Sequence, residues 1–555
     1  MKLREIAASV LLATTSVVNA VELNIDDEES IKSAASTIAY EMVSYYYGNT
    51  TEGIPGLLGD PYYWWEAGAM FGALIDYWYY TGDDTYNEIT TQAMLHQTGP
   101  QDNFEPPNQT KSLGNDDQAF WAMAAMSAAE QKYPNPPDDE PQWLALVQAV
   151  FNRQAARWDE TSCGGGLKWQ IFTFNNGYNY KNSISNGAFF NMAARLGFYT
   201  KNETYLEWAT RSWEWSKAVG LISPQYFVFD GTDDNLNCSQ LNHVQWSYNA
   251  GVHLLGAAVM WNMTADDEAV QSQWEERVRG LLQASGVFFK DGVMYEVACE
   301  PQMNCNTDQQ SFKAYLSRWM AASTKYAPWV YDLVTPNLEK SAMAAAQSCS
   351  GGETGVTCGT RWTYDGWDNT WGVGQQMNAL EVIQGMLIQK ASGPVSNDTG
   401  GISRGDPNAG TDDGGAGGGG GGGPGQRPDQ ITTGDQAGAG ILTAVILIGL
   451  LGGAWYAHSE LRRLEDSTDS VLQVDDRIIG RECQTKDLWT RCNISESQWD
   501  DAVEQHYGKV GAVEMSCLGE TSHGVDGTDG VLGRLRKQSD GLEFEPSCNA
   551  MCQCA

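Results

Sequence analysis

The sequence predicts an all-α domain in which six helix pairs close into an (α/α)6 toroid, followed by a flexible linker and one transmembrane helix. Between about residues 31 and 392 the chain is rich in helix-forming and aromatic residues and has few alternating β-branched runs. A related motif recurs there about every 50–70 residues, the length of two helices with their connections. Gly-rich sequence and then a long apolar run follow the last repeat.

The repeated motif is a polar or Gly-containing loop that opens into a helix of small and aromatic residues. Its six copies start at Tyr63, Asn115, Ser185, Ser247, Ser311 and Thr370. We expect the helices that follow to form an inner ring packed closely through Gly, Ala and Ser. The loops at their N-termini are then expected to line one common cleft. This repeat favours a single domain over residues 21–395, although the length alone would suggest two or three.

The first 20 residues have the pattern of a secretory signal peptide. Lys2 and Arg4 form a basic segment, residues 6–18 are apolar, and residues 18–20 form a small-residue cleavage site. A buried first helix is the alternative. The apolar run is too short to span a bilayer and an acidic segment follows it, so we expect the mature chain to begin near Val21.

Sequons and cysteines in the predicted domain fit export to an oxidising compartment. The sequons lie at Asn49, Asn108, Asn202, Asn237, Asn262 and Asn397, and the cysteines at Cys163, Cys238, Cys299, Cys305, Cys349 and Cys358. Six cysteines allow fifteen pairings. Short separations favour Cys299 with Cys305 and Cys349 with Cys358, which would leave Cys163 for Cys238.

The net charge of −36 and the pI of about 4.4 argue against nucleic acid as a partner, because phosphates require a basic face. An acidic, soluble exterior facing a neutral ligand fits better. The chain has no P-loop, dinucleotide fingerprint, nucleophile elbow or zinc-type histidine cluster. We therefore expect neither a metal nor an organic cofactor.

The C-terminal part changes character. Residues 396–436 are Gly-rich and are expected to form a flexible linker. Residues 437–457 carry no charge and are long enough to cross a bilayer, with Arg462 and Arg463 on the expected cytosolic side. A cleaved GPI signal is the alternative, but residues 458–555 follow, where such a signal needs its apolar tail at the end. No fold can be assigned to that tail, which could also be an error of gene prediction.

Asp116 and Asp117 are the candidate catalytic residues. Glycoside hydrolysis uses two carboxyl groups beside the scissile bond, and two close like charges raise one pKa and keep that group protonated. Alternatively, these residues simply cap the helix expected at 118–130, where acidic residues are favoured. Other Asp-Asp pairs, at 83–84, 138–139, 233–234 and 266–267, lie in turn-like contexts.

The stretch from Tyr46 to about Gly385 resembles glycoside hydrolase family 76, the fungal and bacterial endo-α-1,6-mannanases. The matching segments are Gly114-Asn-Asp-Asp-Gln-Ala-Phe-Trp, Ser247-Tyr-Asn-Ala-Gly, Phe312-Lys-Ala-Tyr-Leu-Ser-Arg and Gln375-Gln-Met-Asn-Ala-Leu-Glu. Ala250 departs from the Gln that many relatives carry. The resemblance implies a retaining enzyme with Asp116 as nucleophile and Asp117 as general acid/base. It also implies α-1,6-mannan or a GPI-type glycan as substrate, and a role in fungal cell-wall organisation.

Sugar binding uses aromatic platforms and planar polar groups, and the chain has 21 Trp and 24 Tyr. The candidate substrate-binding residues are Trp65, Asp230, Tyr248, Asn249, Lys313 and Trp371. All except Asp230 stand at starts of the repeated helices and are expected to face the cleft. Each could instead belong to the core or to a cap, and Asp230 could form an Asx turn.

Three other functions stay open from the sequence. The first is a transglycosidase that links GPI-glycan proteins to wall glucan. The second is a non-catalytic mannan receptor, which the membrane span and the tail would suit. The third is an inverting enzyme, whose carboxyl groups would lie about 6.5–9.5 Å apart and usually on different repeats. In each case we expect a monomer in the secretory pathway, tethered to the plasma membrane or an endomembrane with its large domain outside the cytosol.

Overall fold

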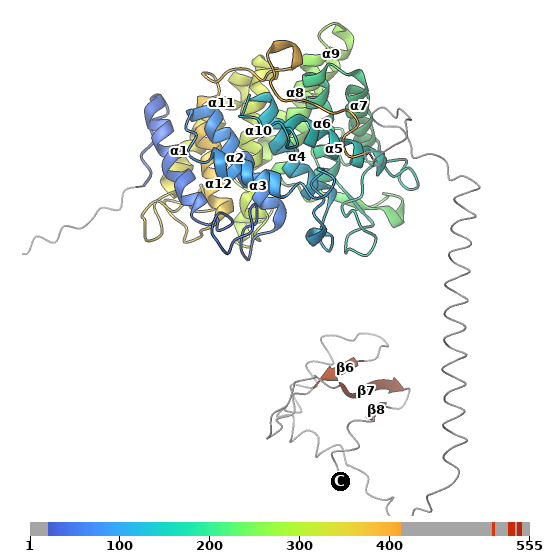
Figure 1. The fold of residues 1–555 in the computed structure, drawn as a ribbon. Coiled ribbons are helices and arrows are strands. Elements are labelled where there is room, and N and C mark those ends of the chain that lie inside the picture. The colour runs from blue at the N-terminus through green and yellow to red at the C-terminus, as the bar shows by residue number, and fades with distance from the viewer. Residues whose placement is uncertain (1–19, 412–512, 517–530, 539–540, 547–555) are drawn as a thin grey trace, which may run out of the picture. The chain divides into compact units, whose positions relative to one another are not determined.

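The computed structural model describes residues 20–411, 513–516, 531–538 and 541–546 (Figure 1). The chain divides into two compact units, residues 1–430 and 431–555, each described here by itself. The described part of the first unit contains twelve α-helices: α1 (Glu28–Val43), α2 (Trp64–Thr81), α3 (Asn87–His96), α4 (Asn115–Glu130), α5 (Trp143–Ala156), α6 (Ser183–Thr200), α7 (Glu203–Ala218), α8 (Ser247–Met263), α9 (Glu268–Ala284), α10 (Phe312–Tyr326), α11 (Tyr331–Ser348) and α12 (Val373–Gln384).

The six even-numbered helices form a closed inner ring. Each packs on the next along the chain, from α2 and α4 through to α10 and α12, and α12 returns to α2. The odd-numbered helices pack on the outside of this ring; α7 lies on α6 and α9 on α8 (Figure 1). Each inner helix begins within three residues of a predicted motif start, so the predicted helical ring is confirmed.

Inner helices are buried on nearly all sides because they face both the ring centre and an outer helix. Every residue of α12 is buried. Small residues permit the close approach that this arrangement needs. A Cβ added to Gly68 on α2 would lie 2.7 Å from the indole of Trp121 on α4, and one on Gly251 of α8 would lie 2.9 Å from Trp319 on α10. A side chain at either position would push two inner helices apart.

Short strands, which the sequence did not predict, lie in the loops of this domain. β1 (Tyr180–Asn182), β2 (Gly231–Asp233) and β3 (Leu241–Asn242) form an antiparallel sheet in that order. β4 (Phe289–Lys290) pairs with β5 (Val293–Met294). These strands are too brief to give an alternating pattern over the four or more residues that identifies a strand in a sequence.

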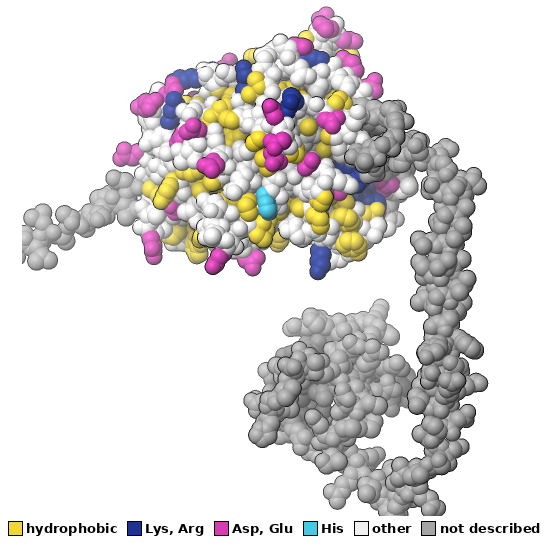
Figure 2. Space-filling view, in the orientation of Figure 1, with side chains coloured by type: hydrophobic (Ala, Val, Ile, Leu, Met, Phe, Trp, Pro, Cys, Tyr) yellow, Lys and Arg dark blue, Asp and Glu magenta, His cyan; other side chains and the backbone are white. Residues whose placement is uncertain are grey.

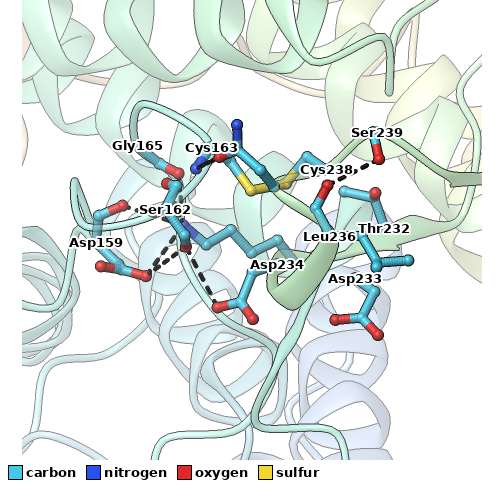
Figure 3. Close-up of a disulfide and its surroundings, with 12 residues drawn as sticks. Asp159, Ser162, Cys163, Gly165, Thr232, Asp233, Asp234, Leu236, Cys238 and Ser239 are labelled. Carbon is cyan, nitrogen blue, oxygen red and sulfur yellow. Dashed lines mark hydrogen bonds and ion pairs between the residues drawn. A yellow bond between two sulfur atoms is a disulfide. The ribbon is translucent and has the colours of Figure 1, made fainter.

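Disulfides connect the loops in the predicted pairs Cys163–Cys238, Cys299–Cys305 and Cys349–Cys358. The Cys163–Cys238 bond joins the loop after α5 to the segment between β2 and β3 (Figure 3). Beside it the fully buried ammonium of Lys181 donates to the carbonyls of Asp159, Ser162 and Gly165. Loop 157–182 is thereby fixed from two sides.

The packed structure extends beyond residue 395, where the sequence placed the end of the domain. Ser403 accepts a hydrogen bond from the N–H of Leu144 on α5, and the Asn152 amide donates to the carbonyls of Pro407 and Ala409. The segment up to residue 411 therefore lies along α5. Because this segment contains many glycines and prolines, its composition indicated a linker and did not predict these contacts.

The described strands of the second unit are β6 (Val513–Ser516), β7 (Val531–Gln538) and β8 (Gly541–Pro546), paired antiparallel in that order. No helix within the described ranges is long and apolar enough to cross a bilayer. The predicted signal peptide, most of the predicted linker and the predicted span at 437–457 lie outside the described residues.

Candidate active site

Loops and helix starts at one end of the inner ring surround an open cavity of about 820 Å³, here called cavity A. Five residues predicted from the sequence reach it. The lining consists of Trp65, Asp116, Asp117, Phe120, Trp169, Tyr180, Asn182, Asp230, Trp246, Tyr248, Asn306, Asp308, Gln309 and Phe312. Four of these are carboxylates, and no lysine or arginine is among the described lining residues.

Asp116 and Asp117 occupy the first turn of α4, which places their carboxylates beside the positive end of the helix dipole. The Asp117 carboxylate accepts the Gly114 N–H at 2.6 Å, while Asp116 Oδ1 accepts the Asp117 N–H at 3.1 Å. Asn182, the N-cap of α6, donates to Asp116 Oδ2 at 3.4 Å. Asp116 and Asp117 therefore cap the start of α4 and also line cavity A, so the capping and the catalytic interpretations of this pair are compatible.

Gly114 shows how closely the two carboxylates converge. A Cβ at this position would meet Asp117 Oδ2 at 3.0 Å and Asp116 Oδ1 at a still shorter distance. Two oxygens that both lie within 3.0 Å of one point are less than about 6 Å apart, a limit that is compatible with the spacing of about 5–5.5 Å in retaining enzymes and lies below the about 6.5–9.5 Å of inverting ones. Any residue other than glycine at 114 would displace one carboxylate.

The loop after α5 fixes the start of α4. The Asn115 N–H donates to the Trp169 carbonyl at 2.8 Å, and its side-chain amide donates to the Lys168 carbonyl at 2.8 Å. Arg157 donates to Asn115 Oδ1 at 2.8 Å. The same loop presents Trp169 and Tyr180 to cavity A, so the hydrogen bonds of the buried Lys181 to this loop indirectly position the cavity wall.

Asp230 and Tyr248 form another part of the lining of cavity A. Asp230 Oδ2 accepts hydrogen bonds from the Tyr180 hydroxyl at 2.6 Å and from the Asn242 amide at 3.1 Å. The Tyr248 ring stacks on Phe312, with ring centroids 3.9 Å apart and an interplanar angle of 7°. Both residues line cavity A, and aromatic side chains commonly contact sugar rings.

Asp308 is a cavity residue that the sequence reading missed. It lies just before the 3-10 helix η5 (Gln309–Ser311) and accepts the indole N–H of Trp65 at 3.0 Å. Trp65 itself packs against Phe120 at a centroid distance of 4.6 Å. Asp308, Trp65, Asp117 and Trp169 also line a second open cavity of about 890 Å³, here called cavity B, so these four residues separate the two cavities.

Burial in a cavity without cations raises the pKa of all four carboxyl groups. Burial and the charge of Asp117 hold the pKa of Asp116 well above its ordinary value. Burial raises the pKa of Asp117 to about 7, against the hydrogen bond from the Gly114 N–H, and Asp308 adds to the increase. Burial likewise raises the pKa values of Asp230 and Asp308, although their hydrogen-bond donors oppose it. The catalytic pair therefore retains a proton near neutral pH.

Asn249, Lys313 and Trp371, predicted to bind substrate, do not line this cavity. Asn249 is completely buried inside the ring. The ammonium of Lys313, also buried, pairs with Glu300 at 2.6 Å and donates to the Thr360 carbonyl. Trp371 is 64% exposed and precedes α12 outside the lining. Successive helix residues point about 100° apart, so position at a helix start does not by itself bring a side chain to the cleft.

Three of the missed lining residues share a position that could have identified them. Asn182, Trp246 and Asp308 lie one to four residues before the starts of α6, α8 and α10, at Ser183, Ser247 and Phe312. Residues just before a helix still have loop geometry and can turn their side chains across the ring opening. Reading each motif from a few residues earlier would have placed Asp308, the fourth carboxylate, in the site.

Comparison with known proteins gives a consistent result. The family model of Glycosyl hydrolase family 76 matches residues 30–398. Mannan endo-1,6-alpha-mannosidase DCW1 of Saccharomyces cerevisiae is 46% identical over 446 residues, covering 80% of this chain and 96% of that protein. Mannan endo-1,6-alpha-mannosidase DFG5 of the same yeast is 43% identical over 439 residues, covering 79% and 94%.

Solved structures agree on the fold. Dfg5 from Chaetomium thermophilum, crystallised in complex with glucosamine, is 48% identical, with a TM-score of 0.67 over 70% of this chain and 97% of that one. An inactive variant of the alpha-1,6-mannanase GH76A of Salegentibacter sp. HEL1_6, in complex with alpha-1,6-mannotriose, has a TM-score of 0.52 at 17% identity and covers 65% and 99%. At that identity the likeness shows a shared fold.

Proposed function

Because this chain belongs to glycosyl hydrolase family 76, we propose that it is a mannan endo-1,6-α-mannosidase, a glycosidase that cleaves internal α-1,6 linkages of mannose chains. The observation that carries this proposal is the Asp116–Asp117 pair, held at the start of α4 in a cavity that is open to solvent and large enough for sugar rings. Aromatic faces and hydrogen-bonding groups around the pair suit a neutral, polyhydroxylated substrate.

The mechanism supported by the geometry is a retaining double displacement. An Asp116 oxygen attacks the anomeric carbon, the bond from that carbon to the bridging oxygen breaks, and Asp117 gives its proton to the leaving oxygen. Water then attacks the same carbon while Asp117 takes a proton from it, and the bond to Asp116 breaks. The convergence of both carboxylates on Gly114 supports this mechanism over inversion.

The pKa values and the position of the two carboxyls point to different residues for the acid. The pKa of Asp116 is raised further, which would favour a proton on Asp116 in the free enzyme. Asp117 stands between the two cavities, where the oxygen bridging two sugars would lie. We assign Asp117 as the acid, because positive charge developing on the sugar stabilises ionised Asp116 at the moment of attack.

Product sizing tests the proposed reaction. The full chain incubated with linear α-1,6-mannan is expected to give a falling distribution of chain lengths, as an endo-acting enzyme does, and the first products are expected to keep the α-anomeric configuration by NMR. Added azide is expected to restore turnover of an activated substrate to Asp117→Ala and not to Asp116→Ala. Rescue confined to Asp116→Ala would exchange the two roles, and release of mannose alone from chain ends would exclude endo cleavage.

We also propose that the chain is exported and tethered to a membrane with this domain outside the cytosol. The leader-like first 20 residues, the sequons and the uncharged stretch at 437–457 support this proposal. Three disulfides in the loops fit an oxidising compartment. An antibody to residues 466–555 is expected to stain only permeabilised cells. Release of the domain by phosphatidylinositol-specific phospholipase C would instead establish a lipid anchor.

A further inference from the structure

A third cavity, here called cavity C, is separate from the catalytic cleft. Its volume is about 370 Å³, less than half that of cavity A, and it shares no lining residue with cavity A or cavity B. Most of its lining is polar. The lining consists of Glu300, Met303, Cys305, Gln310, Thr360, Arg361, Asp368 and Thr370. The chemistry described above uses none of these residues.

Contacts within the protein shape cavity C before any ligand binds. One side belongs to loop 285–311, in which the Cys299–Cys305 disulfide joins residues six positions apart. The other side belongs to loop 349–372, in which the Asp368 carboxylate accepts three backbone N–H groups of its own loop. Asp368 also accepts the Thr370 hydroxyl at 2.7 Å. Both walls of cavity C are therefore held in place independently of an occupant.

Glu300 supplies a free hydrogen-bond acceptor in this cavity. Its side chain is only 3% exposed, and its Oε1 is taken by the Lys313 ammonium at 2.6 Å and by the Glu296 N–H at 2.9 Å. Its Oε2 is buried and has no hydrogen-bond partner among the described residues. A buried carboxylate oxygen without a donor is destabilising, so this oxygen indicates that a donor from outside the chain occupies the cavity.

Arg361 supplies free hydrogen-bond donors in the same cavity. Its Nε donates to Asp368 Oδ2 at 3.2 Å, and its side chain is 27% exposed. The two terminal nitrogens of the guanidinium donate to none of the described residues. Because a guanidinium carries five N–H donors and no acceptor, these nitrogens remain able to bind an oxygen of a ligand.

The charges around cavity C favour a neutral ligand. Lys313 already neutralises Glu300, and Asp368 already neutralises Arg361. A cationic or an anionic ligand would therefore add an unpaired charge. On the face of the domain drawn in Figure 2, acidic side chains are more widespread than basic ones, which further disfavours an anion. A hydroxyl group both donates and accepts, so neighbouring hydroxyls satisfy Glu300 and Arg361 together.

We propose that cavity C is a second sugar-binding site, which holds one unit of a mannose chain outside the catalytic cleft. One hydroxyl of that unit donates to Glu300 Oε2, and a neighbouring hydroxyl accepts from Arg361. The choice of mannose rests on the function proposed above, whereas the site for a neutral polyol rests on cavity C alone. Gln309 lines cavity A and Gln310 lines cavity C, so one segment borders both. A long chain held at both places binds more tightly than a short one held only in the cleft.

Electrophoresis of the native full chain through gels that contain linear α-1,6-mannan tests this site. The chain carries Asp116→Asn and Asp117→Asn, so that the polymer is retained and not cleaved, and the slowing by mannan gives an apparent Kd. Adding Arg361→Met is expected to raise this Kd about threefold, as loss of one hydrogen bond predicts. Arg404→Met is the matched control, because it breaks an exposed Arg–Asp pair elsewhere, and it should leave the Kd unchanged.

The acceptor is tested by a double variant. Glu300→Gln alone would leave Lys313 buried without its counter-ion, whereas Glu300→Gln combined with Lys313→Met removes both charges. This double variant is also expected to raise the Kd about threefold. An unchanged Kd in either variant would show that only water occupies cavity C, and would overturn the site.

Cleavage by the chain with both catalytic aspartates intact separates cavity C from the cleft. Arg361→Met is expected to raise KM for mannan and to leave kcat/KM for α-1,6-mannotetraose unchanged, because the short chain binds in the cleft alone. An equal loss on both substrates would show that the substitution disturbs the cleft, and would overturn the second site. A wild-type chain that is inactive on both substrates but still slowed by mannan through Arg361 would overturn the proposed function and leave the sugar site standing.

Discussion

The two ends of the inner ring are built on different principles. At the opposite end from cavity A, the helices of a pair are joined by short connections, such as 201–202 between α6 and α7 and 264–267 between α8 and α9. At the cavity end the connections are long, such as 157–182 and 349–372, and they contain all three described disulfides. The helices thus provide a rigid frame, and the loops at one end provide the site.

Both ends of the ring contain buried charged side chains, but these side chains differ in whether they have a partner of opposite charge. Away from cavity A, Arg318 pairs with Asp76 at 2.9 Å and with Glu381 at 2.8 Å, and Arg195 pairs with Glu130 at 2.6 Å. At the cavity end, the four carboxylates that line cavity A have no lysine or arginine among the described lining residues, although other carboxylates there, such as Asp159, are paired with a cation. Buried carboxylates with cation partners hold the frame together, whereas carboxylates without them have raised pKa values and remain available for chemistry.

Replacing either catalytic aspartate is expected to have the largest effect on activity. Asp116→Asn and Asp117→Asn should each lower the rate of mannan cleavage by roughly 10³-fold or more, because each removes one half of the two-carboxyl mechanism. The melting temperature should not fall, since each change removes a carboxyl group whose ionisation burial makes unfavourable in the folded chain. Reducing-end release and thermal unfolding measure the two effects. Near-normal activity in either variant would show that the pair is misassigned.

Breaking the buried ion pairs at the end of the ring away from cavity A is expected to lower stability more than activity, the reverse of the catalytic substitutions. Arg318→Met leaves Asp76 and Glu381 buried without their cation, which should lower the free energy of unfolding by about 3–5 kcal/mol. Denaturant titration measures this loss. Arg279→Met, which breaks the exposed pair with Glu275 on α9, is the control and should cost no more than about 0.5 kcal/mol. Equal stability of the two variants would show that the buried cluster does not support the frame.

The frame could be predicted from the sequence because its helices repeat. Motif spacing located all six inner helices to within three residues, and the Asn-Asp-Asp motif marked the cavity residues Asp116 and Asp117. The ion pairs at the other end could not be foreseen, because Arg318 and Asp76 lie far apart in the chain and meet only when the ring closes.

The loops were predicted less well, since contacts across the ring opening decide which way each side chain points. Asp308 escaped notice because its partner, the Trp65 indole, belongs to the first turn of α2, 243 residues earlier in the chain. Lys313 was expected in the cleft, but its ammonium pairs with Glu300, and neither residue lines cavity A. Such contacts have no local sequence pattern. Composition and motif spacing therefore predict where a residue lies in the fold, but not in which direction its side chain points.

The smallest expected effect concerns the pH dependence of stability, and it separates the two kinds of carboxylate by sign. Burial raises the pKa of Asp117 from its ordinary 3.8 to about 7, so the folded chain binds this proton more tightly than the unfolded chain. The stability that the proton provides is complete below about pH 4 and is lost as the pH rises to about 7. Relative to wild type, Asp117→Asn should therefore gain about 1–2 kcal/mol of unfolding free energy between pH 4 and 7, a value reduced because the group faces an open cavity.

Asp159 provides the opposite case. Burial alone would raise its pKa, but hydrogen bonds from Thr161 and from the Lys181 ammonium hold that pKa below the ordinary value. Asp159→Asn should lose stability relative to wild type at pH 7 and lose less as the pH falls below 4. Denaturant midpoints of the three proteins at pH 3, 4, 5.5 and 7 measure both slopes, and slopes of the same sign would refute the distinction between the unpaired carboxylates of the cavity and the paired ones that support it.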